Sequence, residues 1–144
     1  MMAYCLSADV QASLDERVLL WLTNDNDAAT TVDTDIIDEA IRDADATIDA
    51  YCRKRYTVPF DPVPDKVRAL SRTIAIYTLY SRKGINDGPE QTVRDNYKDA
   101  IAFLKDVSAG RAEIVEGSAP TAPSNRVSAR SRTKIFSESD LEKF

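Results

Sequence analysis

The stretch DEAIRDADATIDAYCRKRYTVPF, residues 38–60, decides the fold. Together with the residues just before it, this stretch carries an apolar stripe at helical spacing, with members recurring every three or four positions. The stripe consists of Ile37, Ile41, Ala44, Ile48 and Tyr51. We therefore predict an amphipathic helix that begins at a cap provided by Asp33 or Thr34 and ends at about Tyr56.

Five acidic residues crowd into the first part of this stretch. On the helical wheel Asp38, Asp45 and Asp49 lie together, away from the apolar stripe, and Asp43 points elsewhere. We interpret them as the solvated side of the helix. The alternative is a weak cation site or a catalytic pair formed by Asp45 and Asp49, although the sequence supplies no further ligands of the kind that calcium or magnesium requires. The basic cluster at 53–55 suits the negative end of the helix dipole.

The whole chain predicts an all-α fold, a small bundle of about four to five helices with an extended C-terminal arm. Apolar spacing and turn signals predict further helices over about 7–13, 14–23, 64–83 and 89–108. Ser7 is the expected cap of the first of these helices. The second groups Trp21 with the apolar residues Val18, Leu19 and Leu22. Gly110 is expected to end the last.

The helix expected over about 64–83 has more apolar surface than a single core contact requires. Its core stripe is formed by Val67, Leu70, Ile74 and Tyr77. A second apolar side carries Ala69, Ile76 and Tyr80, which we take as the candidate oligomer interface. Either this is the central helix of the bundle, or another subunit covers one of its sides, and the two interpretations are compatible.

The composition changes after residue 116, and we divide the chain into a helical body, 1–116, and an arm, 117–144. The arm holds five basic and three acidic residues, whereas the body holds 14 basic and 21 acidic residues, so the two carry net charges of +2 and -7. Basic and apolar side chains of the arm are its candidate contacts, either with its own body or with a neighbour. They are Arg126, Arg130, Arg132, Lys134, Ile135, Phe136, Leu141 and Phe144.

Several function classes are disfavoured by what the 144 residues contain. There is no histidine, which excludes Ser-His-Asp and Cys-His catalysis and histidine-ligated metal sites within this sequence. No phosphate-binding loop or zinc spacing is present, so we expect no enzyme activity, no cofactor and no metal. We expect no membrane span and no signal peptide. Cys5 and Cys52 are expected to be buried, reduced thiols.

Several blocks of the chain resemble one family. These blocks are AYCLSADV, IIDEAIRDADATIDAYCRKRYTVPF, VPDKVRALSRTIAIYTLYSRKG, DNYKDAIAFLKDVSAG and FSESDLEKF. The family is that of small Mu-like prophage structural proteins with a domain of unknown function, and it resembles the all-helical head-tail connector, or adaptor, proteins of long-tailed phages. The resemblance covers nearly the whole chain and carries over no catalytic residues.

The resemblance implies a structural subunit of a twelve-fold ring in the virion, assembled in the host cytoplasm. Such a ring lies between the portal protein and a tail-completion or tail-tube protein, and DNA passes through its channel without sequence-specific binding. A tail-completion or stopper protein of the phage neck is the closest alternative. Two further alternatives are a small enzyme that uses Asp45, Asp49 and a lysine, and a DNA-binding regulator that uses residues 126–134.

Overall fold

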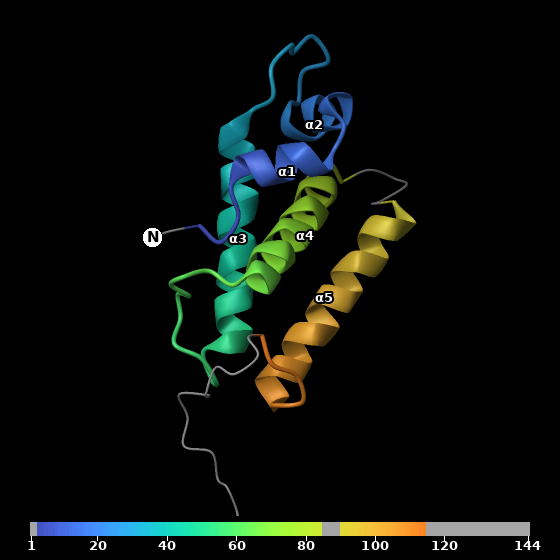
Figure 1. Ribbon diagram of the computed structural model, residues 1–144. Helices are drawn as coiled ribbons and strands as arrows, with labels where there is room; N and C mark the ends of the chain where they lie inside the picture. Colours follow the sequence, from blue (N-terminus) through green and yellow to red (C-terminus); the bar gives the residue numbers. More distant parts are fainter. Residues whose placement is uncertain (1–2, 85–89, 115–144) are drawn as a thin grey trace, which may run out of the picture.

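The computed structural model describes residues 3–84 and 90–114, which form five α-helices and no strand. The helices, in chain order, are α1 (Ser7–Ser13), α2 (Glu16–Thr23), α3 (Thr34–Cys52), α4 (Asp65–Arg82) and α5 (Gln91–Ala109). Figure 1 shows the three long helices side by side, with α1 and α2 packed across one end. The predicted all-α bundle is confirmed.

The helix α4 is the central element of the bundle. It packs against each of the other four helices, most extensively against α3. Its predicted core stripe is buried at Val67, Leu70 and Ile74, while Tyr77 is only half-buried and stacks on Tyr97 of α5 with ring centroids 3.8 Å apart. The large apolar circumference of α4 is therefore explained in large part by contacts within the chain.

The helix α3 has the predicted cap and most of the predicted stripe. The Asp33 carboxylate accepts a hydrogen bond of 3.0 Å from the backbone N–H of Asp35. The stripe from Ile37 to Ile48 is buried, and Tyr51 is half-buried. The helix ends at Cys52, four residues before the predicted Tyr56, because a hydrogen-bonded turn over residues 52–56 replaces the last helical turn.

The prediction that Asp45 and Asp49 belong to a solvated face is wrong. Their side chains are buried, with only 4 % and 7 % of the residue surface exposed, whereas Asp38 and Asp43 are exposed as expected. The segment that begins at Tyr4 covers this flank of α3. Because Tyr4 lies 41 residues before Asp45, the periodicity of α3 alone contains no sign of the cover.

The two buried aspartates hold a hydrogen-bond network around Tyr4. The Tyr4 backbone N–H donates to Asp45 at 2.9 Å, and the Ser71 hydroxyl of α4 donates to the other oxygen of Asp45 at 2.6 Å. The Tyr4 hydroxyl donates to Asp49 and accepts from the backbone N–H of Phe60 at 3.0 Å. Four segments distant in the sequence are thereby joined, and the buried polar groups satisfy one another.

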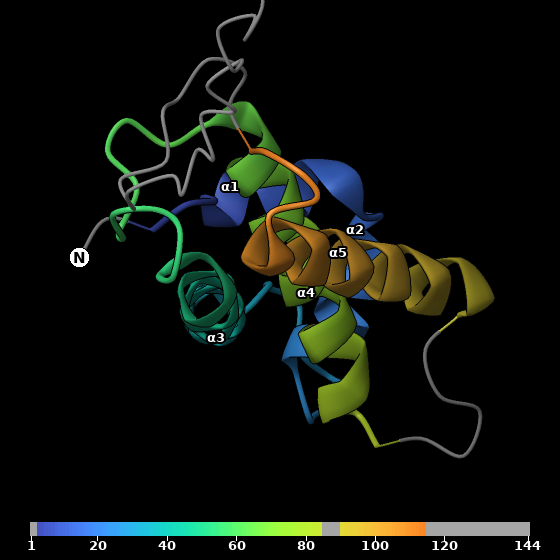
Figure 2. The same cartoon turned by 90° about the horizontal axis from the view of Figure 1, so that it is seen from below.

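The C-terminal end of α5 meets the segment that follows α3. Gly110 ends α5 as predicted, with a left-handed φ of 79°. The Arg55 guanidinium lies so close that a Cβ built on Gly110 would be 1.7 Å from its Nη2 atom. Beyond it, the backbone N–H of Ile114 donates to the Tyr56 hydroxyl at 3.2 Å. Figure 2, seen from below, shows this end of α5 nearest to α3.

The predicted cap of α1 is also wrong. Ser7 is the first helical residue, and Leu6 occupies the cap position without a side-chain acceptor. The Asp9 carboxylate reaches back instead and accepts from the Leu6 backbone N–H at 2.9 Å. An acid at the third helical position can accept a hydrogen bond from a free amide at the start of the helix, so a hydroxyl cap is not required here.

We predict that Asp45→Ala lowers the free energy of unfolding by about 2–4 kcal/mol, because it leaves the Tyr4 amide and the Ser71 hydroxyl buried without their acceptor. Asp45→Asn should cost less, since it keeps the shape and one carbonyl acceptor. Urea unfolding followed by circular dichroism measures both variants, and Asp38→Asn on the exposed side of α3 is the matched control.

The same variants have a predictable pH dependence. Burial raises the pKa of Asp45 above 3.8, and the hydrogen bonds from Ser71 and Tyr4 only partly oppose that rise. Above pH 3.8 the folded protein therefore retains this proton to a higher pH than the unfolded chain does. The free energy of unfolding of the wild type should thus decrease, relative to that of Asp45→Asn, as pH rises from 3.8 through the raised pKa. If the free energies of unfolding of wild type and Asp45→Asn changed with pH in the same way, a buried charge on Asp45 would be contradicted.

We also predict that Gly110→Ala destabilises the protein more than Gly84→Ala. Both glycines have positive φ, 79° and 56°, so each alanine costs about 1 kcal/mol in backbone strain. Only Gly110 faces a side chain, that of Arg55, while no atom lies within 4 Å of a Cβ at Gly84. Thermal unfolding measures the two variants together with Gly110→Ala combined with Arg55→Ala. The double variant lacks the Arg55 side chain, so it separates the backbone strain at Gly110 from the steric clash with Arg55. Equal costs for the two alanine variants would contradict this prediction and would show that the flexible end of the Arg55 side chain moves aside at little cost.

Candidate interaction surfaces

Trp21 of α2 is exposed on the surface of the bundle. Leu19 and Leu22 of the same helix are buried, but 45 % of Trp21 is exposed, which corrects the prediction that groups the three. The Trp21 ring meets Tyr80 of α4 edge to face, with centroids 6.4 Å apart, and the Lys83 ammonium lies 5.7 Å from its centroid. On the helical wheel Trp21 lies about 160° from Leu19, so the pattern contained a sign of this exposure.

The basic end of α4 holds the loop after α2 in place. Arg82 donates to the backbone carbonyl of Leu22 at 3.1 Å and forms an ion pair of 2.9 Å with Asp25. Lys83 donates to the backbone carbonyl of Asn24. The hydrogen bond from Arg82 holds the pKa of the Asp25 carboxyl below its usual value. These contacts fix the end of α2 on α4 and thus the position of the tryptophan.

The candidate interface residues of α4 are distributed over its outer side. Ala69 lines a groove of about 320 Å³ between α4 and α5, where the Lys66 ammonium lies 4.5 Å from the Phe103 ring centroid. Ile76 packs against the core, and Tyr80 lies against Trp21. All three candidates are half-buried. Contacts within the chain therefore cover part of their apolar surface and leave the rest exposed. We name Trp21 and Tyr80 together the aromatic patch.

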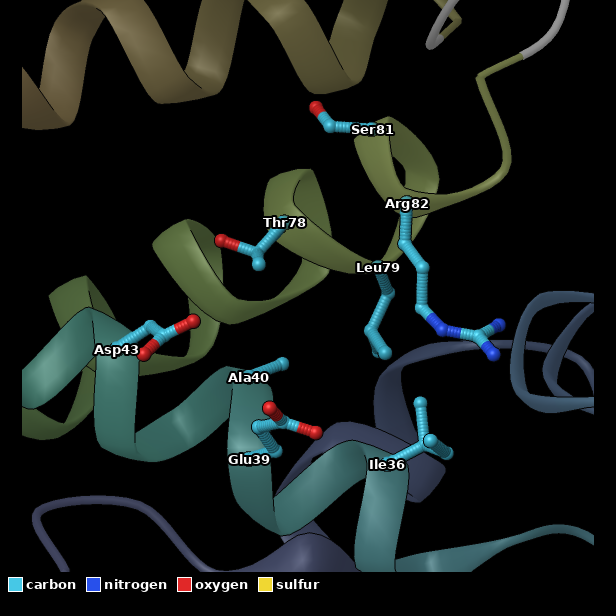
Figure 3. A pocket seen from close by; sticks show the side chains of 8 residues that line it. All are labelled: Ile36, Glu39, Ala40, Asp43, Thr78, Leu79, Ser81 and Arg82. Atoms are coloured by element: carbon cyan, nitrogen blue, oxygen red, sulfur yellow. The ribbon is translucent and has the colours of Figure 1, made fainter.

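A larger groove, of about 450 Å³, lies between the first half of α3 and the last turns of α4. Figure 1 shows α5 leaning away from α3 toward this end of the bundle. Its apolar floor is formed by Ile36, Ala40 and Leu79. Figure 3 shows the Glu39 and Asp43 carboxylates along its α3 wall and the hydroxyls of Thr78 and Ser81 along its α4 wall, with Arg82 at one end.

The titratable groups of the core serve structure. Asp45 accepts hydrogen bonds on both of its oxygens and Asp49 accepts one from Tyr4, so neither aspartate presents a bare carboxylate to solvent. Within residues 3–84 and 90–114, no group of three or more cysteines or acids is placed to hold a metal ion. Cys5 and Cys52 are buried and form no disulfide, as predicted, and burial raises the pKa of their thiols to about 12 and about 11.

The remaining predictions concern the surface and the arm. No helix in the described part of the chain is long and apolar enough to cross a membrane. The basic cluster at 53–55 lies at the end of α3, where Arg53 follows the last helical residue and its Nε donates to the Asp49 carbonyl at 3.4 Å. The candidate arm contacts lie outside the described residues. They are Arg126, Arg130, Arg132, Lys134, Ile135, Phe136, Leu141 and Phe144.

Comparison with known proteins connects this helical body to a phage family. The sequence profile of the family described as Bacteriophage Mu, Gp36 matches residues 4–133. The match includes all five helices and the first part of the arm, but not the closing segment FSESDLEKF.

A relative with a similar sequence is the Mu-like prophage FluMu protein gp36 of Haemophilus influenzae. The two are 33 % identical over 82 residues, which make up 57 % of this chain and 55 % of the relative. The alignment thus spans about half the length of that curated relative. Because the family profile matches far more than half of the chain, the protein belongs to the Bacteriophage Mu Gp36 family of Mu-like phage proteins.

Proposed function

We propose that this protein is a structural, non-enzymatic head-tail connector subunit of a Mu-like phage. In this proposal copies of the chain form a twelve-fold ring in the neck of the virion, between the portal protein and a tail-completion or tail-tube protein. The ring assembles in the host cytoplasm and continues the DNA channel. Family membership supports the phage setting.

The observation that carries the proposal is the aromatic patch. Trp21 remains 45 % exposed although Tyr80 and Lys83 support its ring, so it presents a rigid apolar surface. Tryptophan and tyrosine are enriched among the residues that dominate protein–protein binding energy. A stable subunit contact buries about 1,600 Å² in total, and the half-buried side of α4 next to the patch supplies further apolar area.

The charge distribution agrees with a subunit that binds its neighbours and releases DNA. The body, 1–116, has a net charge of -7 and the arm, 117–144, a net charge of +2. Opposite charges favour contact between the arm of one copy and the body of another. An acidic channel wall repels the phosphate backbone, so DNA would slide through without sequence-specific binding.

The rival functions receive less support from the described residues. A carboxylate enzyme would need an accessible pair, whereas Asp45 and Asp49 are buried and bonded to Tyr4 and Ser71. A DNA-binding regulator that uses residues 126–134 would have to overcome the acidic body. A tail-completion or stopper protein of the neck would have the same architecture, and its position in the particle distinguishes it from a connector.

The proposal predicts that deletion of 117–144 leaves a folded helical body that no longer assembles. Every helix and core residue in the described part of the chain lies before residue 115, so the helical circular dichroism spectrum and cooperative unfolding should persist. Complementation of a Mu-like phage that lacks this protein, followed by protein analysis of purified particles, measures incorporation. Normal incorporation of the truncated chain would contradict a role for the arm in assembly.

The aromatic patch gives an independent prediction. Trp21→Ala should lower incorporation into particles by about tenfold or more, since buried aromatic anchors contribute about 2 kcal/mol or more to binding. The unfolding midpoint should fall only modestly, because 45 % of Trp21 is already exposed, although its contacts with Tyr80 and Lys83 are lost. Thr92→Ala, an exposed site on α5, is the control. If the Trp21 variant were incorporated as well as the wild type, the claim that the aromatic patch lies in the subunit interface would be contradicted.

A further inference from the structure

The exposed side of α3 carries a regular ladder of negative charge. Asp35, Glu39 and Asp43 follow one another at intervals of four residues, and all three are exposed. Four residues of helix advance about 6 Å and return to nearly the same side, so the carboxylates form one strip. Among the described residues none of the three carboxylates is ion-paired, including with Arg42 on the flank of the strip.

Part of the strip borders the larger groove, and Asp35, one helical turn before Glu39, lies beyond the residues that line it. Glu39 and Asp43 line that groove directly, and its floor of Ile36, Ala40 and Leu79 is apolar. Arg82, the basic residue that lines the groove, is already paired with Asp25 at 2.9 Å. A ligand that fits the groove would therefore carry a row of positive charges beside apolar side chains.

The arm of this chain contains such a sequence. Arg130, Arg132 and Lys134 alternate with small residues and lead directly into Ile135 and Phe136. In an extended peptide, alternate side chains point to the same side and stand about 7 Å apart. That spacing is close to the 6 Å steps of the acidic strip, so three bases can meet three acids in register.

We propose that residues 130–136 of one copy dock, extended, in the α3–α4 groove of a neighbouring copy. The three bases pair with Asp35, Glu39 and Asp43, and an apolar side chain at 135 or 136 covers the groove floor. This inference rests on the proposed ring and names the receiving surface within it.

The length of the arm permits this exchange. The described chain leaves the body at Ile114, at the end of the bundle opposite the groove. The residues from there to Arg126 extend to roughly 40 Å, which exceeds the roughly 28 Å length of α3. The arm can thus reach past its own body to a copy beside it. Docking on its own body is the competing arrangement that the experiment must exclude.

Disulfide trapping between two differently tagged full-length chains tests the proposal. One chain carries Ser81→Cys in the groove and the other carries Thr133→Cys in the arm, and both are expressed during particle assembly. Cys5 and Cys52 are buried, with pKa values raised to about 12 and about 11, so they add little background. After oxidation, we expect particles to contain a disulfide-linked dimer of the two tagged chains, which a reducing agent separates into monomers. The matched control replaces Ser81→Cys by Ala12→Cys, at an exposed site on α1.

Charge reversal shows whether the acidic strip and the bases cause the contact. Arg130→Glu with Arg132→Glu and Lys134→Glu on the arm chain should reduce the trapped dimer by about tenfold or more. Glu39→Lys with Asp43→Lys on the groove chain should then restore it, whereas Asp38→Lys, on another side of α3, should not.

Two results would overturn the docking site alone, and a third would overturn it together with the connector role. One is the lack of a mixed dimer while both chains are incorporated into particles, which leaves the proposed connector role intact. The other is a disulfide that forms only when both cysteines are on the same chain, which indicates docking on the chain's own body. Failure of both chains to enter particles, with no mixed dimer in the lysate, would contradict the connector role together with the docking site.

Discussion

The fold depends on one buried constraint, the attachment of Tyr4 to two aspartates of α3. Through its backbone and hydroxyl, Tyr4 joins the N-terminal segment to Asp45, Asp49 and the loop at Phe60. Ser71 brings α4 into the same network. Charged groups in a low-dielectric interior are stabilising only when their hydrogen bonds are complete, so the network fixes how these segments meet. The two acids thus help to specify how the helices are arranged.

The central helix α4 contributes to both the aromatic patch and the α3–α4 groove. Its inner side fills the core, and its last turn holds the end of α2 through Arg82 and Lys83. That contact places Trp21 against Tyr80 on the outside. The opposite side of the same last turns forms the groove with α3. The aromatic patch and the groove are therefore positioned by the same turns of α4.

The elements of the fold were largely predictable because they depend on local periodicity and turn chemistry. The stripe from Ile37 to Ile48 and the stop at Gly110 are examples. The burial of Asp45 was not predictable from the helical wheel, since the segment that covers it comes from the distant N-terminus. The exposure of Trp21 was detectable in the pattern of α2, because Trp21 lies about 160° from the buried Leu19 on the helical wheel. The groove depends on how α3 and α4 pack against each other, which no single stretch of sequence encodes.

The most direct test of the account is electron cryomicroscopy of the neck of an intact Mu-like particle that contains this chain. The account predicts several copies arranged in a closed ring between portal and tail, with Trp21 of each copy buried against an adjacent copy. A chain that lies elsewhere in the particle, or that touches no other copy of itself, would contradict the claim that its exposed apolar surface serves self-assembly.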